Sequence, residues 1–277
     1  MSKDSRIVLS CSTLVYKLDR FPNLQDNLNA IKEMGFKAVD LAAFENWQNI
    51  NPSMLLKSPD FFNATVDVIK NSGLKVTGIN AGFSEKIEDP SEEAFTRYTQ
   101  EFRKLLEFSN AIGCDVVTIQ AGNYRDMDFD QLFERIAQRA EILGGIASEY
   151  NISLNLEGHY GSTLEKLDNA VKMMERVGRY VGFTYDPSHY IMQGLTLEDT
   201  RPLVSYTGQV HIRNAKAGRM QADMETGEID IAEFVRLLRK ENYEGSVAIE
   251  YFNGFDADLT NTLELRDKLL AEGLVLI

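Results

Sequence analysis

The chain has 277 residues, of which 44% are hydrophobic and 26% charged, and its formal net charge is −13 at pH 7. This acidic balance opposes stable binding to nucleic acid, which needs clustered Lys and Arg. No stretch approaches the ~18 uninterrupted apolar residues of a membrane span. The N-terminal segment is charged and lacks the apolar region of a secretory signal, and Cys11 and Cys114 form no metal motif. We therefore expect a cytoplasmic protein with neither nucleic-acid nor membrane partners.

Short runs rich in β-branched residues alternate with longer segments whose apolar residues recur at helical spacing. The short runs predict eight strands, at residues 6–12, 37–43, 75–81, 115–120, 153–159, 182–186, 209–213 and 246–252. The longer segments predict eight helices, at residues 24–34, 60–69, 92–112, 129–150, 164–177, 197–205, 231–240 and 259–270. Strict alternation of strand and helix indicates parallel strands joined by right-handed crossovers.

Local signals mark several predicted helix ends. Ser162 followed by Glu165 matches a capping box at a helix start. Glycines are placed to end four helices before the next strand: Gly35, Gly73, Gly113 and Gly245. The turn after the first strand reads Cys-Ser-Thr-Leu-Val, without the G-x-G-x-x-G loop that an open doubly wound sheet usually has. We therefore predict an α/β fold, a single (β/α)8 TIM barrel that spans residues 1–277 as one domain.

Polar side chains gather at the carboxyl ends of the last four predicted strands, the end of a TIM barrel where active sites lie. In strand order these are Glu157 and His159, Asp186 and His189, His211 and Arg213, and finally Glu250. Because side chains alternate along a strand, the members of the first and third pairs each share a face. The chain has only three histidines, and all three belong to this set. Such clustering is unusual for histidines that serve only the core.

Two Glu and one Asp that converge with a His are hard to bury without a cation, because packed carboxylates repel one another and lose solvation. We therefore predict one divalent metal ion with four ligands: Glu157, Asp186, His211 and Glu250. A mixed oxygen and imidazole shell favours Mn2+, with Mg2+, Co2+, Fe2+ and Zn2+ as alternatives. Closed structural zinc sites prefer sulfur and nitrogen ligands.

The motifs at these strand ends resemble those of the xylose-isomerase-like TIM-barrel superfamily. They are most similar to its sugar phosphate isomerase/epimerase branch, which includes ketose 3-epimerases, inosose dehydratases and hydroxypyruvate isomerases. The motifs read Glu157-Gly-His159, Asp186-Pro-Ser-His189, His211-Ile-Arg213-Asn and Ile249-Glu250-Tyr. The stretch Gly227-Glu-Ile-Asp230, followed by Phe234, is also similar. The resemblance is densest over residues 151–252, and the first half matches only in layout.

The resemblance implies that the four residues named above are the metal ligands. It also implies that His189 contacts a substrate hydroxyl near the metal and that Arg213 is a substrate-facing cation. His159 is a candidate acid or base, or a hydrogen-bonding group behind the ligands. Trp47 and Gln120 are candidates for substrate contact on the same rim. Other aromatic residues on this rim either pack or contact substrate: Phe44, Phe83, Tyr124, Tyr160, Tyr190 and Phe252.

One metal ion held by two Glu suits proton transfer next to a carbonyl, with Glu157 and Glu250 as base and acid on opposite faces of the substrate carbon. We expect an isomerase or epimerase of carbohydrate metabolism that acts on a keto-sugar or related polyol through a metal-stabilised enediolate. Returning the proton to the opposite face gives epimerisation, and returning it to the neighbouring carbon gives isomerisation. The alternative is a metal-dependent lyase, inosose dehydratase-like or C-glycoside-cleaving, in which the same intermediate expels a leaving group.

Two other functions fit the residues less well. DNA-repair endonucleases of the superfamily hold three metals and need histidines on the third and fourth strands, where this chain has Asn80 and Gln120. They also need an Asp-x-His pair after the seventh strand, and residues 219–230 contain no His. A non-catalytic subunit would be expected to lose a ligand, and none is missing. The expected partner is therefore a small-molecule carbohydrate, and a homo-oligomer stays open.

Overall fold

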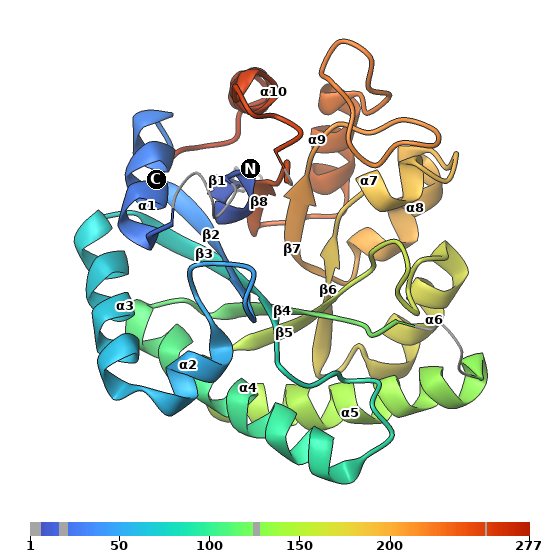
Figure 1. Ribbon diagram of the computed structural model, residues 1–277. Helices are drawn as coiled ribbons and strands as arrows, with labels where there is room; N and C mark the ends of the chain where they lie inside the picture. The colour runs from blue at the N-terminus through green and yellow to red at the C-terminus, as the bar shows by residue number, and fades with distance from the viewer. Residues whose placement is uncertain (1–6, 17–21, 124–127, 253) are drawn as a thin grey trace.

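Eight parallel strands close into a barrel with the helices around it (Figure 1). The computed structural model describes residues 7–16, 22–123, 128–252 and 254–277. Each strand pairs with the next along the chain, and β1 closes the ring against β8. The strands are β1 (Val8–Ser12), β2 (Ala38–Phe44), β3 (Lys75–Gly82), β4 (Val116–Gln120), β5 (Ser153–Glu157), β6 (Val181–Tyr185), β7 (Thr207–Ile212) and β8 (Ser246–Ile249). The predicted (β/α)8 TIM barrel is confirmed.

Every predicted helix is present with shifted or identical ends. The helices are α1 (Leu24–Glu33), α2 (Pro52–Lys57), α3 (Pro59–Ser72), α4 (Glu92–Ile112), α5 (Phe129–Glu149), α6 (Leu167–Val177), α7 (Ser188–Ile191), α8 (Leu197–Val204), α9 (Ile231–Lys240) and α10 (Thr260–Ala271). The short α2 and α7, and a 3-10 turn at Thr13–Val15, were not predicted. None of the described helices combines the length and apolar character needed to cross a membrane.

The strands are buried on both faces, because one face lines the barrel and the other packs under helices. Strand β2, Ala-Val-Asp-Leu-Ala-Ala-Phe, is buried at every position and contains one charged residue, Asp40. The outer helices are amphipathic and begin at capping residues. At α4, for example, the Ser91 side chain accepts from the N–H of Ala94, and the left-handed Gly113 ends the helix.

The loop before α6 corrects one prediction. Ser162 and Glu165 form no capping box, because α6 begins later, at Leu167. Their side-chain oxygens instead accept backbone N–H groups within the loop after β5. The capping box in the described part of the chain is Thr196 with Asp199, at the start of α8.

One predicted glycine stop is also wrong. Gly35, Gly73 and Gly113 follow helices with positive φ, as expected. After α9, however, Asn242 takes the left-handed conformation, with φ 57°, and Gly245 lies beyond it. Asn tolerates this region because its short side chain can bond the local backbone.

Two strands, β8 and β5, end two or more residues earlier than predicted. β8 ends at Ile249, its last residue in register with β7, and the N–H of Glu250 makes one further hydrogen bond to the main-chain oxygen of Ile212, at 2.9 Å. Phe252 therefore lies in a loop. β5 ends at Glu157, and Gly158 leads the chain into a turn, which places His159 off the strand. The first predicted strand began at Arg6, which lies outside the described residues.

Candidate metal centre

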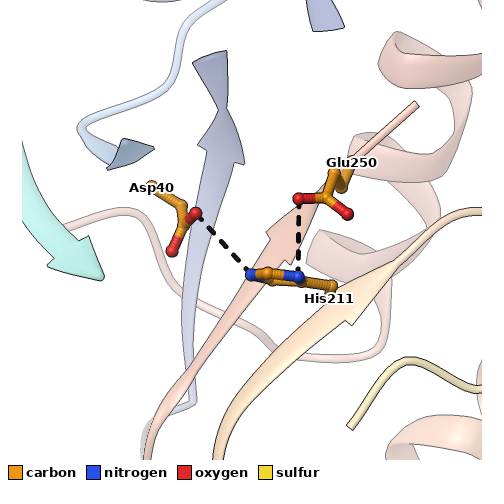
Figure 2. Close-up of side chains that lie close together, drawn as sticks. All are labelled: Asp40, His211 and Glu250. Carbon is orange, nitrogen blue, oxygen red and sulfur yellow. Dashed lines mark ion pairs between the residues drawn. The ribbon is translucent and has the colours of Figure 1, made fainter. Parts of the chain in front are cut away.

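His211 lies at the centre of a buried carboxylate cluster at the carboxyl end of the barrel. Its Nδ1 is 3.0 Å from Glu157 Oε1 and 3.4 Å from Glu250 Oε1. Its Nε2 faces the other way, 3.6 Å from Asp40 Oδ1. Figure 2 shows the imidazole between Asp40 and Glu250, with one ring nitrogen toward each. Three of the four predicted ligands thus meet around one ring nitrogen.

Asp186, the fourth predicted ligand, follows β6 and joins the cluster through Arg213. One terminal nitrogen of Arg213 lies 2.8 Å from Asp186 Oδ2, and the other lies 2.9 Å from Glu250 Oε2. Ligand atoms of Glu157, Asp186 and His189 all lie within 4.8 Å of one another, and those of Asp40, His211 and Glu250 do the same. The predicted ligands are therefore divided between two adjoining groups on one rim.

Arg213 faces the interior, as strand alternation predicted. Its side chain is 1% exposed, and it also donates to the main-chain oxygen of Glu250 at 2.8 Å. His189 Nε2 lies 3.0 Å from the guanidinium, and the Phe252 ring lies 4.9 Å from it. Burying a guanidinium is costly without partners of this kind. In the structure these partners of Arg213 are all protein groups.

The charges of the cluster fit a divalent cation. Four buried carboxyl side chains, Asp40, Glu157, Asp186 and Glu250, converge on His211 and Arg213. Glu250 Oε1 is buried and has no hydrogen-bond partner among the described residues. A buried oxygen without a donor costs free energy that a metal ligand bond removes. The carboxylate and imidazole donors suit Mn2+ or Mg2+ better than a soft ion.

The two glutamates have pKa values that are shifted apart. Burial raises the pKa of Glu250, the charge of His211 opposes the rise, and the result is about 7. Burial also acts to raise the pKa of Glu157, but the hydrogen bond and charge of His211 hold it well below 4.5. At His211, burial lowers the pKa, but Glu250, Asp40 and Glu157 raise it well above 6.5. Paired groups with separated pKa values are typical of acid and base partners.

His189 and His159 lie beside the cluster. Burial lowers the pKa of His189 to about 4, and its Nε2 is 3.7 Å from Asp186 Oδ2. His159 is half-buried, and its ring centroid lies 6.1 Å from that of His189. Its Nδ1 is 2.9 Å from the main-chain oxygen of Tyr160, and its Nε2 has no hydrogen-bond partner in the described part of the chain. His159 thus has one buried ring nitrogen that no described protein group satisfies.

Trp47 and Gln120 lie together on the rim formed by β2 to β4. Both line a cavity of about 310 Å3, along with Phe44, Phe83 and other residues of this rim. That volume is at the lower end of the range of small-molecule sites. The Trp47 side chain is 42% exposed. Gln120 pairs with Glu157 in the β4–β5 register. The cavity therefore adjoins the metal centre.

Several other rim aromatics pack. Phe83 lies 4.6 Å from the Tyr98 ring, and the buried Tyr190 donates its hydroxyl to the main-chain oxygen of Leu164. Tyr160 is exposed. Tyr124 lies outside the described residues.

Sequence reasoning missed three polar residues of the site. Asn80 donates to Glu157 Oε2 at 3.3 Å, and Gln209 donates to Asp40 Oδ2 at 2.9 Å. Asp40 itself had a detectable signal, because it is the one charged residue in an otherwise apolar run of β2. No signal in the sequence indicates that Asp40 lies close to His211, because 171 positions separate the two residues.

The fold agrees with the comparison to known families. A sequence profile of the family described as xylose isomerase-like TIM barrel matches residues 28–270, and the chain belongs to this family. An inosose dehydratase from Bacillus velezensis is 22% identical over 191 residues, which cover 57% of this chain and 64% of the relative. The chain thus matches less than two thirds of that curated relative.

Solved structures show the same fold. A D-tagatose 3-epimerase-like protein superposes with a TM-score of 0.76 at 18% identity, covering 96% of this chain and 98% of the other. A xylose isomerase-like TIM barrel protein from Mycobacterium smegmatis, solved in complex with magnesium, gives a TM-score of 0.74 at 15% identity and covers 97% and 96%. At these identities the likeness concerns the fold.

Proposed function

We propose that this protein is a divalent-metal-dependent isomerase or epimerase that moves a proton next to the carbonyl of a keto-sugar or related polyol. The observation that carries the proposal is the position of two glutamates around one ring nitrogen. Glu157 from β5 and Glu250 after β8 approach His211 Nδ1 at 3.0 and 3.4 Å. Proton transfer at carbon needs a base and an acid that reach the same centre.

Glu157, Asp186, His211 and Glu250 would hold the metal ion, with Mn2+ as our first choice. Their oxygen and imidazole donors support this assignment, and the magnesium in the M. smegmatis neighbour is of the same hard class. When bound, such an ion supplies Lewis-acid stabilisation of negative charge on a substrate oxygen.

The protein groups then share the work of proton transfer and orientation. Glu157, whose pKa is held low, takes the proton from the carbon next to the carbonyl. Glu250 returns a proton from the other side, because its strand lies three places further round the barrel. Arg213, His189 and His159 bind substrate hydroxyls, and the cavity beside Trp47 and Gln120 takes the remainder of the sugar.

A lyase is the second candidate, and the similarity to inosose dehydratase favours it. The same carbanion expels a hydroxyl or another leaving group when one lies β to the carbonyl, and protonated Glu250 or His159 can supply the proton that leaves with it. The two candidates use one site and differ only in the fate of the intermediate.

Solvent exchange separates them. The protein, loaded with Mn2+, is incubated in D2O with ketohexoses and with inososes, and the products are followed by NMR. Deuterium at the carbon next to the carbonyl, without loss of water, supports the epimerase or isomerase. Loss of water supports the lyase. Absence of both exchange and product across these substrates contradicts the proposal. Elemental analysis should give one ion per chain, and two or three would contradict the single-metal site.

A further inference from the structure

Asp40 Oδ1 and His211 Nε2 are buried and face each other at 3.6 Å (Figure 2). Neither atom has a hydrogen-bond partner among the described residues. Leaving a buried polar atom unpaired is costly, and each of these two atoms is placed to satisfy the other. A small approach brings them to the usual hydrogen-bond distance of about 2.7–3.2 Å.

The other oxygen of Asp40 belongs to a built hydrogen-bond chain. Gln209 donates to Asp40 Oδ2 at 2.9 Å and accepts from the Ser246 hydroxyl at 2.7 Å, which fixes the orientation of its amide. Gly78 lies opposite Asp40 in the β2–β3 register, and any side chain there would collide with Asp40 and Gln209. Strands β2, β3, β7 and β8 thus cooperate to fix Asp40 behind His211.

We infer that Asp40 is a positioning residue that keeps the His211 proton on Nε2, so that the Nδ1 lone pair faces the metal site. The inference rests on the metal site of the proposed function and adds a residue that does not itself contact metal or substrate. Histidine ligands commonly donate their second ring N–H to a carboxylate, which fixes the tautomer and the ring orientation.

The hydrogen-bond chain makes a distinctive prediction for Asp40→Asn. Gln209 presents its NH2 group to position 40, so the Asn carbonyl would turn toward Gln209 and its own NH2 toward His211. A donor at that point favours a lone pair on Nε2 and moves the proton to Nδ1. An Asp-to-Asn change behind a catalytic histidine is known to act in this way, through the wrong tautomer. The close isostere should therefore harm metal binding more than Asp40→Ala does.

Calorimetric titration with Mn2+ alone tests this order without any substrate. We expect Asp40→Asn to weaken Mn2+ binding about 10–100-fold, the range for partners behind metal ligands, and Asp40→Ala to weaken it less. Asp256→Asn is the matched control, a buried aspartate whose oxygens accept from Asn261 and Thr262, and it should bind Mn2+ as the wild type does. An Asp40→Asn affinity equal to or better than that of Asp40→Ala overturns the inference.

A measurement on the wild type covers the case in which a variant fails to fold. The chain has three histidines, so 15N spectra of the protein loaded with diamagnetic Mg2+ or Zn2+ can be assigned by substituting His159 and His189. His211 protonated at Nε2, with metal at Nδ1, supports the role of Asp40, and the opposite tautomer overturns it. A wild type that binds none of these ions overturns the metal site and this role with it, whereas normal binding without turnover defeats only the proposed reaction.

Discussion

The two halves of the barrel contribute differently to its carboxyl-terminal mouth. The strands from β5 to β8 supply the four predicted ligands and Arg213, all of them buried. In the first half, the ends of β2, β3 and β4 and the segments after them line the cavity that contains Trp47 and Gln120. In the described part of this first half, Asp40 contacts the cluster at His211 Nε2, the ring nitrogen that faces away from the glutamates, and Asn80 contacts it at Glu157 Oε2.

This difference suggests that the second half of the barrel determines the type of reaction and the first half determines which substrate binds. The second half is cross-linked by ion pairs between 2.8 and 3.4 Å, so its side chains are held in one arrangement. The cavity of the first half is lined by aromatic and amide side chains such as Trp47 and Gln120. These side chains take no part in the ion pairs of the second half, so replacing them leaves those pairs intact. We therefore expect changes in the second half to alter the chemical step and changes in the first half to alter the affinity for substrate.

The largest effect should come from Glu157→Gln or Glu250→Gln. Each should lower kcat about 1,000-fold, within the usual range for a lost acid or base, because an amide occupies the site but neither accepts nor releases a proton. Glu107→Gln, on the exposed side of α4, is the control. Steady-state rates and circular dichroism on the same samples check both activity and fold. A near-normal rate in either variant would remove that glutamate from proton transfer.

Arg213→Lys should have an intermediate effect. Lys cannot reproduce the planar fork of Arg, so we expect KM to rise or kcat to fall about 10–100-fold while metal content stays unchanged. Arg176→Lys, at the surface pairs with Glu134 and Glu141, is the control. Kinetics and metal analysis are measured on one preparation. Lost metal or a lower Tm with unaltered kinetics would show that Arg213 serves the ligands and not the substrate.

Trp47→Ala tests the first half alone. Loss of an exposed aromatic surface should raise KM about tenfold, equivalent to about 1.4 kcal/mol, with little change in kcat or Mn2+ affinity. Tyr180→Ala is the control, since this exposed tyrosine precedes β6 at the other end of the barrel. A Trp47→Ala variant that loses kcat and keeps its KM would break the division between the halves.

The smallest effect that we expect is a pH dependence of the stability of the metal-free protein. The pKa of Glu250 is raised to about 7 and that of His211 well above 6.5, so above pH 6.5 the folded state binds more protons than the unfolded chain. Stability therefore falls as pH rises in that range. Between pH 4.5 and 6.5 the lowered pKa of His189 works in the opposite direction and offsets Glu250.

Thermal melting of chelated protein between pH 6.5 and 8.5 measures this fall. We expect the Tm to decrease by roughly 2–4 °C for each kcal/mol lost. Glu250→Gln should reduce the decrease, since it removes one of these protons and a charge that raises the His211 pKa. A Tm that rises between pH 6.5 and 8.5 would contradict the raised pKa values of Glu250 and His211 in the folded protein.

Most of the fold could be predicted because barrel strands and helices carry local periodic signals. The errors lie where a boundary depends on a distant partner. β8 ends where its register with β7 ends, at the pair Ile212 and Ile249, and no local pattern at residues 250–252 indicates that end. The four-residue α7 is too short to have a period of its own.

The convergence of the candidate ligands could be predicted because each lies near the carboxyl end of an apolar strand or directly after it, where the parallel strands meet. Their contacts could not. Arg213 spans Asp186 and Glu250 through side-chain geometry, which sequence spacing leaves undetermined. Gln209, which donates a hydrogen bond to Asp40, is 169 positions away from it, and only the closed ring brings the two together.

Closure of that ring also has a kinetic consequence. Glu250 directly follows β8, which is paired with β1 along Val8–Cys11, so its place depends on a contact between segments separated by 237 positions, as in the pair Ser10 with Val247. Pairings of such high contact order form slowly, because loop-closure entropy opposes them. A folding intermediate in which β8 has not docked lacks Glu250, which is one candidate ligand and one of the partners of Arg213. With the proposed metal site, tight Mn2+ binding should appear only once β8 has docked, and Mn2+ added during refolding should favour the docked state.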